Sequence, residues 1–208
     1  MKSQISIALI LNMFSLIAAF VSFQLKSIKI DPNISTPMGS AFSVLASHKE
    51  KEKPKNIVYG YLPYWTLGAI EHLQLDKLTD IAYFALRINS DGKIRTTDEE
   101  GFIDPGYNQW KNNEELDELI RDSKANDVRF ALTIISHEDD VSEAFLNCRS
   151  CWDTLLAEIV RELKSKNIKD LNMDFELAEA EPSEGMALKY SQLVNFLNRG
   201  LDDRFGNS

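Results

Sequence analysis

The sequence predicts an α/β protein built on a parallel sheet. Three observations indicate this class: four short apolar runs rich in β-branched and aromatic residues, longer helical or irregular segments between them, and the alternation of the two. Each run is continuous enough to be buried on both faces, as the strands of parallel sheets are. The runs cover residues 57–61, 81–86, 128–135 and 171–175.

The segments between these strands show helical periodicity. Residues 114–124 carry an apolar face, and residues 152–163 repeat apolar side chains at three- and four-residue spacing, with a helix end near Asn167. A last helix is expected to follow Ser183, which suits its N-cap. The Asp91-Gly92 pair after the second strand predicts a tight reversal of the chain.

Four βα units occupy about 150 residues here, whereas a complete (β/α)8 TIM barrel needs about 250. Residues 56–208 are therefore expected to form a half-barrel with about the first four βα units. The first and fourth strands of such a sheet have unpaired edges, which favour aggregation. We expect this chain by itself to be inactive or poorly soluble.

The N-terminal residues predict export. Lys2 is followed by about twenty mostly apolar positions, which is typical of a signal peptide or a membrane anchor. Both alternatives stay open for residues 1–24, the second with a membrane tether through residues 5–24. Residues 25–55 lack a sustained apolar period and predict a flexible linker. The protein is thus expected outside the cytoplasm, either secreted or anchored to the membrane.

The charge balance excludes one class of partner. The chain has 32 acidic and 23 basic residues, a net charge of -9, and its Lys and Arg form no stripe along the sequence. Nucleic acid is therefore not an expected partner. The sequence also gives no indication of a metal or an organic cofactor.

The fourth apolar run carries the most informative polar residues. Alternate side chains of a strand share a face, so Asn172, Asp174 and Glu176 are expected on one face of it. Buried carboxylates survive only where they share protons, form hydrogen bonds, or meet ligand and water. Because neighbouring carboxyl groups resist joint ionisation, one of the two acids is expected to keep a proton that it can donate.

This segment resembles the fourth-strand motif of family 18 glycoside hydrolases, Asp-Gly-apolar-Asp-apolar-Asp-aromatic-Glu. Asn172, Asp174, Phe175 and Glu176 match its last polar and aromatic positions, while Lys169 and Asp170 replace its first Asp and its Gly. Residues 58–65 and 78–85 look like the first and second strands of the family. The third strand departs from it, ending in Ile-Ser-His-Glu instead of Ser-x-Gly-Gly.

The resemblance implies a glycosidase that cleaves β-1,4-linked N-acetylglucosamine polymers, either chitin or peptidoglycan, by a substrate-assisted retaining mechanism. It implies that Glu176 is the general acid, that Asp174 supports the N-acetyl group of the substrate, and that Asn172 replaces an inner Asp. The expected partner is a polysaccharide. A glycan-binding, lectin-like relative without activity and an inactive truncated product remain alternatives.

Aromatic residues near strand ends are the candidates for binding sugar rings, because they offer flat faces. These candidates are Tyr61, Trp65 and Phe84, and His137 after the third strand is a weaker candidate for substrate contact. Ordinary core packing is the competing interpretation for the aromatic residues. Cys148 and Cys151 have the spacing of metal and redox motifs, but no second cysteine pair accompanies them, so we favour a local disulfide.

Overall fold

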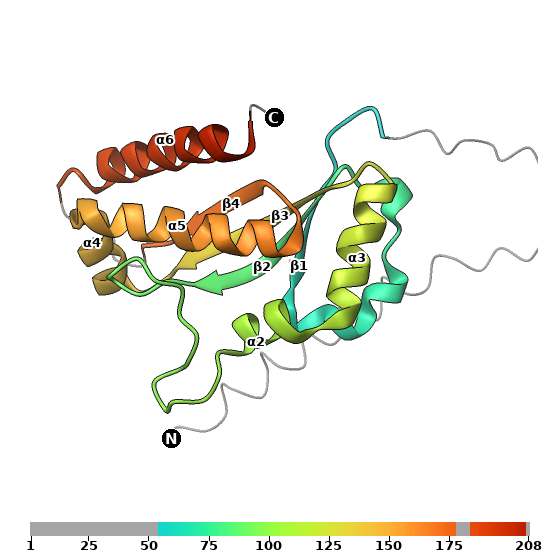
Figure 1. Cartoon of the computed structure of the whole chain (residues 1–208), viewed down its shortest axis with the longest axis horizontal. Coiled ribbons are helices and arrows are strands. Elements are labelled where there is room, and N and C mark those ends of the chain that lie inside the picture. Colours follow the sequence, from blue (N-terminus) through green and yellow to red (C-terminus); the bar gives the residue numbers. More distant parts are fainter. Residues whose placement is uncertain (1–53, 178–183, 207–208) are drawn as a thin grey trace, which may run out of the picture. The chain divides into compact units, whose positions relative to one another are not determined.

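The computed structural model describes residues 54–177 and 184–206, all within one compact unit of the chain, Lys49–Ser208. Its centre is a sheet of four parallel strands in the order β1-β2-β3-β4 (Figure 1). The predicted parallel sheet with its strands in chain order is therefore confirmed. The strands are β1 (Tyr59–Pro63), β2 (Asp80–Arg87), β3 (Arg129–Ser136) and β4 (Asp170–Phe175).

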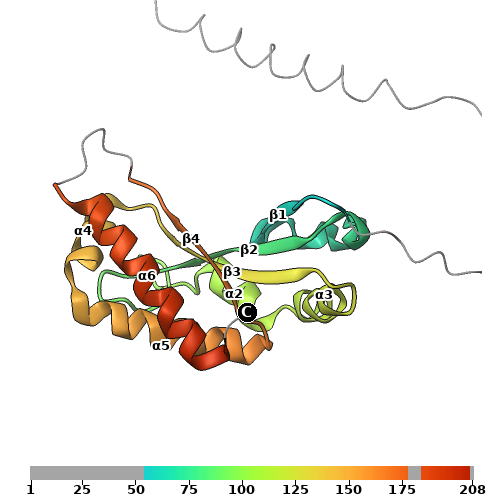
Figure 2. The same ribbon diagram turned by 90° about the horizontal axis from the view of Figure 1, so that it is seen from above.

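Helices follow the strands along the chain. Figure 2 shows α3 and α5 on the same side of the sheet. The five described α-helices are α2 (Pro105–Asn112), α3 (Glu114–Ala125), α4 (Asp139–Asn147), α5 (Arg149–Lys166) and α6 (Met186–Phe205), and two 3-10 helices, Tyr64–His72 and Leu75–Lys77, connect β1 to β2.

The periodic helices agree with their sequence patterns. In α5 every apolar residue of the predicted face is buried. The helix ends at Lys166, and Asn167 after it adopts a left-handed conformation with φ 54°. The last helix begins at Met186, after Gly185 with φ 82°. The predicted cap Ser183 lies outside the described residues.

Helix α2 was not among the expected elements, because its sequence has little apolar character. Asp104 caps its N-terminus by accepting a hydrogen bond from the backbone N–H of Tyr107 at 2.9 Å, and Pro105 occupies the first turn. The hydroxyl of Tyr83 in β2 donates to the carbonyl oxygen of Gly106 at 2.7 Å. Capping and this tertiary contact, rather than periodicity, hold the helix against the sheet.

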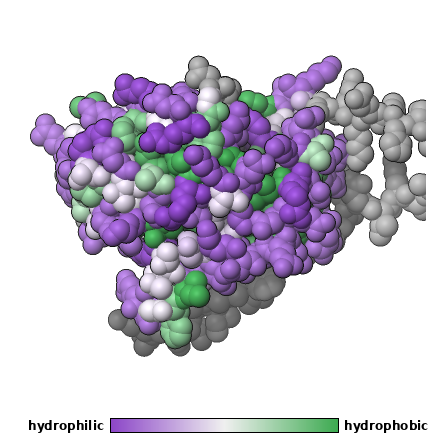
Figure 3. Space-filling view, viewed as in Figure 1, coloured by the Kyte–Doolittle hydropathy of each residue, from purple (hydrophilic) through white to green (hydrophobic). Residues whose placement is uncertain are grey.

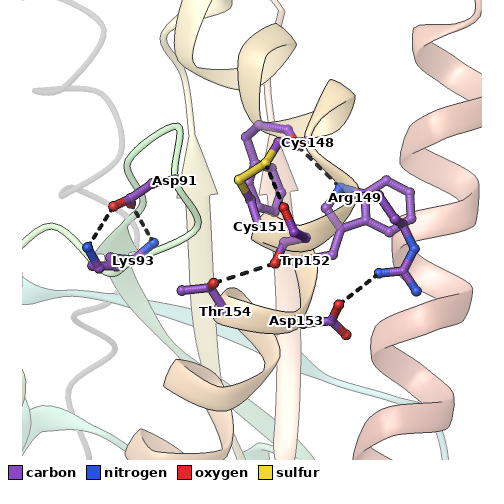
Figure 4. Close-up of a disulfide and its surroundings, with 10 residues drawn as sticks. Asp91, Lys93, Cys148, Arg149, Cys151, Trp152, Asp153 and Thr154 are labelled. Atoms are coloured by element: carbon purple, nitrogen blue, oxygen red, sulfur yellow. Dashed lines mark hydrogen bonds and ion pairs between the residues drawn. A yellow bond between two sulfur atoms is a disulfide. The ribbon is translucent and has the colours of Figure 1, made fainter.

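The predicted reversal at Asp91-Gly92 is present. Gly92 has φ 83°, and its N–H donates to the carbonyl oxygen of Asn89 at 3.0 Å. A Cβ atom on Gly92 would lie 2.1 Å from the carbonyl oxygen of Cys151, so the turn packs directly against the start of α5. Figure 4 shows this turn beside Cys148 and Cys151, whose sulfur atoms are bonded in the structure.

The two faces of β4 make different contacts. On one face, the Phe175 ring centroid lies 6.0 Å from that of Phe145 in α4 and 5.6 Å from that of Tyr190 in α6. On the opposite face, the Asn172 amide donates to the hydroxyl of Thr133 in β3 at 3.3 Å. The apolar residues of β4 therefore pack on helices, and its polar residues face away from them, as the alternation predicts.

No described helix is long and apolar enough to cross a membrane. The predicted signal peptide or anchor, with its hydrophobic helix in residues 1–24, lies outside the described residues, as does nearly all of the predicted linker 25–55.

Candidate active site

Three polar side chains meet where β3 and β4 end. His137 directly follows β3, Asp174 lies near the end of β4, and Glu176 directly follows β4. The backbone N–H of Glu176 donates to the carbonyl oxygen of Ser136 at 3.1 Å, which extends the strand pairing past β4. One ring nitrogen of His137 and one carboxylate oxygen from each acid all lie within 4.8 Å of one another. The carboxyl ends of parallel barrel strands are where barrel enzymes place their active sites.

The closest of these contacts joins His137 to Asp174. The Nε2 atom of the ring lies 3.2 Å from Oδ2 of the carboxylate, and the two side chains are 32% and 28% exposed. A neutral ring with its proton on Nε2 donates a hydrogen bond in this geometry, and a protonated ring forms an ion pair. Partial exposure screens the charges, so the contact orients both groups more than it stabilises the fold.

Glu176 is in a more open setting than Asp174. Its side chain is exposed, and no ion pair joins it to any residue in 54–177 or 184–206. A carboxyl group without a fixed cationic partner is free to exchange a proton with a ligand. The position of Glu176 therefore suits a proton donor at the open end of the sheet.

Asn172 lies two residues before Asp174 in β4, on the same face, and has a different environment. Its amide donates to Thr133, whose side chain is fully buried. The amide bears no charge and cannot take up a proton. Asn172 thus contributes an oriented polar group below Asp174 and no acid–base function.

The predicted sugar-binding residues gather around the ring of Phe84 in β2. Its centroid lies 5.8 Å from that of Tyr61, 6.3 Å from that of Trp65 and 6.3 Å from that of His137. Trp65 and Tyr61 are 64% and 57% exposed. Large exposed aromatic rings next to polar groups are typical of a ligand-binding surface rather than of a core.

Charged residues that sequence reasoning missed lie beside His137. Arg95 donates two hydrogen bonds to Glu138, at 2.9 and 2.7 Å, and these hold the pKa of Glu138 below its usual value. Arg87 adds a weaker ion pair with Glu138 at 3.8 Å. Arg95 and Glu138 are separated by 43 positions in the sequence, so no short sequence pattern predicts this pair.

Tyr190 of α6 supports β4 from the opposite face. Its hydroxyl donates to the carbonyl oxygen of Met173 at 3.3 Å. Burial, and secondly the negative charge of Asp174, raise the pKa of Tyr190. The hydroxyl therefore stays protonated and keeps donating throughout the neutral range.

A cavity lies at the end of the sheet opposite to the candidate site. Figure 3 shows apolar side chains between the polar surfaces of α5 and α3, and a crevice of about 890 Å³ is lined there by the starts of β3 and β4 and the ends of both helices. Its cations include Arg121, Lys124, Lys164 and Lys169. It shares no residue with the candidate site, so size alone does not identify the active site here.

The site has ligand types that divalent cations also use. One imidazole and two carboxylates occur at metal-binding spacing in His137, Asp174 and Glu176, the one such group within the described part of the chain. Exposed acidic groups commonly adopt this spacing without an ion. The geometry by itself therefore assigns no metal.

No protein-family model and no curated protein matches this sequence. Solved structures do match it. A chitinase from Bacteroides thetaiotaomicron superposes with a TM-score of 0.52 and 15% identity, over 71% of this chain and 42% of that chain. The spore cortex-lytic enzyme SleL of Bacillus megaterium QM B1551 has a TM-score of 0.51 and 20% identity, over 70% of this chain and 32% of that chain.

A third structure is a family 18 chitinase from Cycas revoluta in complex with (GlcNAc)3. Its TM-score is 0.53 at 13% identity, over 72% of this chain and 43% of that chain. The described residues thus have a family 18 chitinase-like fold, as the fourth-strand motif indicated. The chain spans less than half the length of each of these three proteins.

Proposed function

We propose that the protein is a glycoside hydrolase that cleaves β-1,4-linked N-acetylglucosamine polymers, with Glu176 as its general acid. One observation carries this proposal: the exposed Glu176 carboxyl directly follows β4, with an oxygen within 4.8 Å of one from Asp174. The shared fold supports it, since two of the structural relatives are chitinases and the third is a spore cortex-lytic enzyme. Chitin and the glycan strands of peptidoglycan are the two substrate candidates.

The proposed reaction is substrate-assisted. Glu176 donates its proton to the glycosidic oxygen while the acetamido oxygen of the substrate attacks the anomeric carbon, so the leaving sugar departs as an alcohol. The ring-closed oxazolinium intermediate is positive, and the Asp174 carboxylate stabilises it by accepting a hydrogen bond from its N–H. Water then opens the intermediate, with Glu176 taking the proton back. Two inversions at the anomeric carbon give net retention.

The aromatic residues around Phe84 are proposed to bind the sugars. The faces of Trp65 and Tyr61 can pack against the apolar faces of pyranose rings. Both residues lie at or near the end of β1, so they adjoin the site on the side away from β4. A glycan that crosses from β1 to β4 would pass Phe84 and His137.

The complete barrel is part of the proposal. In the described part of the chain, β1 and β4 are the edges of the sheet, and further βα units would be needed to close a barrel. Unpaired strand edges favour aggregation. We therefore propose the activity for a closed barrel, to which the described residues contribute four βα units.

Export fits this substrate. We propose that residues 1–24 direct the protein out of the cytoplasm, either as a cleaved signal or as a membrane anchor, because the candidate polymers are extracytoplasmic. N-terminal sequencing of the protein recovered from membrane and soluble fractions separates these two alternatives.

Hydrolysis by the full-length protein tests the activity. It should release products from chito-oligosaccharides or peptidoglycan glycan with the β-anomer formed first, as NMR detects. Glu176→Gln should lower kcat by about 10²–10⁴-fold with KM little changed, because it removes the proton but keeps the shape. Glu115→Gln, at an exposed acid of α3, is the matched control and should leave both constants unchanged. Binding of these glycans without any hydrolysis would instead favour the lectin-like alternative.

A further inference from the structure

The contact with His137 gives the Asp174 carboxylate a hydrogen-bonding partner, which the other side chains of β4 do not provide. Asp174 needs a partner that fixes its carboxylate while leaving it charged. The residue below it on the same face is Asn172, whose amide is already hydrogen-bonded to Thr133 of β3. Asn172 has no titratable proton to share with Asp174, and its side-chain hydrogen bond among the described residues goes to Thr133. His137 Nε2, at 3.2 Å from Asp174 Oδ2, is the titratable group that contacts this carboxylate among the described residues.

We propose that His137 is the positioning residue of this site, holding Asp174 in place of an inner carboxylic acid. The inference rests on the proposed function. Its Nε2–H donates to Oδ2 of Asp174, which fixes the rotation of the carboxylate and leaves Oδ1 to accept the N–H of the substrate's acetamido group. A neutral imidazole does this without cancelling the negative charge that stabilises the oxazolinium ion. His137 acts through Asp174 and need not touch the reacting atoms.

Residues of β2 and α4 border His137. The Phe84 ring of β2 lies 6.3 Å from it, centroid to centroid. Arg87 of β2 and Val141 of α4 line the same small pocket as His137. These neighbours border part of the ring, and the His137 side chain as a whole stays 32% exposed.

The charges that face His137 come from three segments. Asp174 of β4 and Glu176, directly after β4, are the carboxylates next to His137. The carboxylate of the adjacent residue, Glu138, forms ion pairs with Arg95 and Arg87.

Two variants of His137 in the full-length protein test the role. His137→Ala should lower kcat by about 10- to 100-fold with KM little changed, since a misplaced Asp174 affects the transition state more than binding. His137→Asn keeps an N–H donor without a titrating ring, so it should retain more of kcat than the alanine variant.

The sharpest variant places a carboxylic acid at position 172, below Asp174 on the same face of β4. Asn172→Asp in the His137→Ala background should recover at least half of the lost kcat on a logarithmic scale, because an inner carboxylic acid can donate to Asp174. In the wild-type background the same change should alter kcat by less than about threefold, since His137 already occupies this role. His72→Ala, at an exposed histidine of the Tyr64–His72 helix, is the matched control and should leave kcat unchanged.

A measurement without substrate completes the test. NMR of the wild-type imidazole should show the neutral ring protonated on Nε2 with a downfield, hydrogen-bonded Nε2–H proton, and Asp174→Ala should move that proton resonance upfield because its acceptor is lost. An active wild type whose His137→Ala variant keeps its kcat would overturn the inference alone. If Asn172→Asp does not recover kcat in the His137→Ala background, the idea that His137 takes the place of an inner carboxylic acid is overturned. A wild type without any hydrolysis would overturn the proposed function and the positioning role together, and the tautomer would then report only a structural contact.

Discussion

The indole nitrogen of Trp110 in α2 donates a hydrogen bond to Oε2 of Glu162 in α5 at 3.0 Å, although 52 positions separate the two residues. Both side chains are fully buried. Lys111 donates to the same oxygen at 2.9 Å, and Arg161 donates to the other at 3.1 Å. This buried carboxylate joins the helix after β2 to the helix before β4, so it helps to set the positions of the two strands that carry Phe84 and Asp174.

Replacing Glu162 is expected to destabilise the fold. Burial alone would raise the pKa of Glu162, but hydrogen bonds from Lys111, Trp110 and Arg161 outweigh it and leave that pKa lowered. Glu162→Gln should reduce the free energy of unfolding by about 1–3 kcal/mol, since a charge-assisted acceptor is lost. Glu158→Gln, which removes the more exposed partner of Arg161, should cost under about 1 kcal/mol. Urea denaturation of both variants measures the difference.

The same carboxylate predicts a pH dependence. Because hydrogen bonds from Lys111, Trp110 and Arg161 hold the pKa of Glu162 below its usual value, the contribution of Glu162 to stability is fully present above that usual value and is lost as pH falls through the folded pKa. The stability gap between wild type and Glu162→Gln should therefore shrink on acidification and stay constant between pH 6 and 8, about two units above the usual Glu pKa. A gap that widens in acid would contradict this assignment.

Gly106→Ala is expected to disturb the contact between α2 and β2. A Cβ atom there would lie 2.5 Å from the carbonyl oxygen of Ala85, next to Phe84 of the candidate site. The clash should cost about 1–3 kcal/mol of stability, because backbone must move to relieve it. Gly68→Ala is the matched control: a Cβ atom at Gly68 meets nothing within 4 Å. Thermal unfolding should show a lower midpoint only for Gly106→Ala.

Trp65→Ala is expected to weaken glycan binding. The indole is 64% exposed and packs edge-on against Tyr64, with ring centroids 4.9 Å apart, so its removal exposes no core. We expect about a tenfold higher Kd for N-acetylglucosamine oligomers, equivalent to about 1.4 kcal/mol. Val194→Ala, at a partly exposed residue of α6, should leave the Kd unchanged. Calorimetric titration gives both values, and equal affinities in Trp65→Ala and wild type would remove Trp65 from the binding surface.

The pair Cys148 and Cys151 is expected to be oxidised in the exported protein and to stabilise the start of α5. A loop of this short span should contribute about 2 kcal/mol by restricting the unfolded chain. Cys148→Ser combined with Cys151→Ser should lower stability by about that amount, and reductant should have the same effect on wild type. Ser150→Ala between them is a control that leaves the pair intact. Thiol titration of the unreduced protein should find neither cysteine free.

Local patterns predicted much of the fold because strands and amphipathic helices are periodic over a few residues. The alternation along residues 171–176 correctly separated the polar face of β4 from the face that packs on α4 and α6. The repeat in α5 likewise identified its buried side chains. Helix α2 escaped prediction because its place depends on Tyr83 and Glu162, which lie far from it in the sequence.

The sequence by itself determined the parallel α/β class, the order of the four strands and the acids that end the fourth. Only the tertiary structure decided which residues of the site contact one another. His137 contacts Asp174 across 37 positions, and Arg95 pairs with Glu138. Tyr61 and Trp65 lie beside the ring of Phe84. The physical reason is that periodicity fixes the face on which a side chain lies. Contact between separate strands depends on register and packing, which no short stretch of sequence contains.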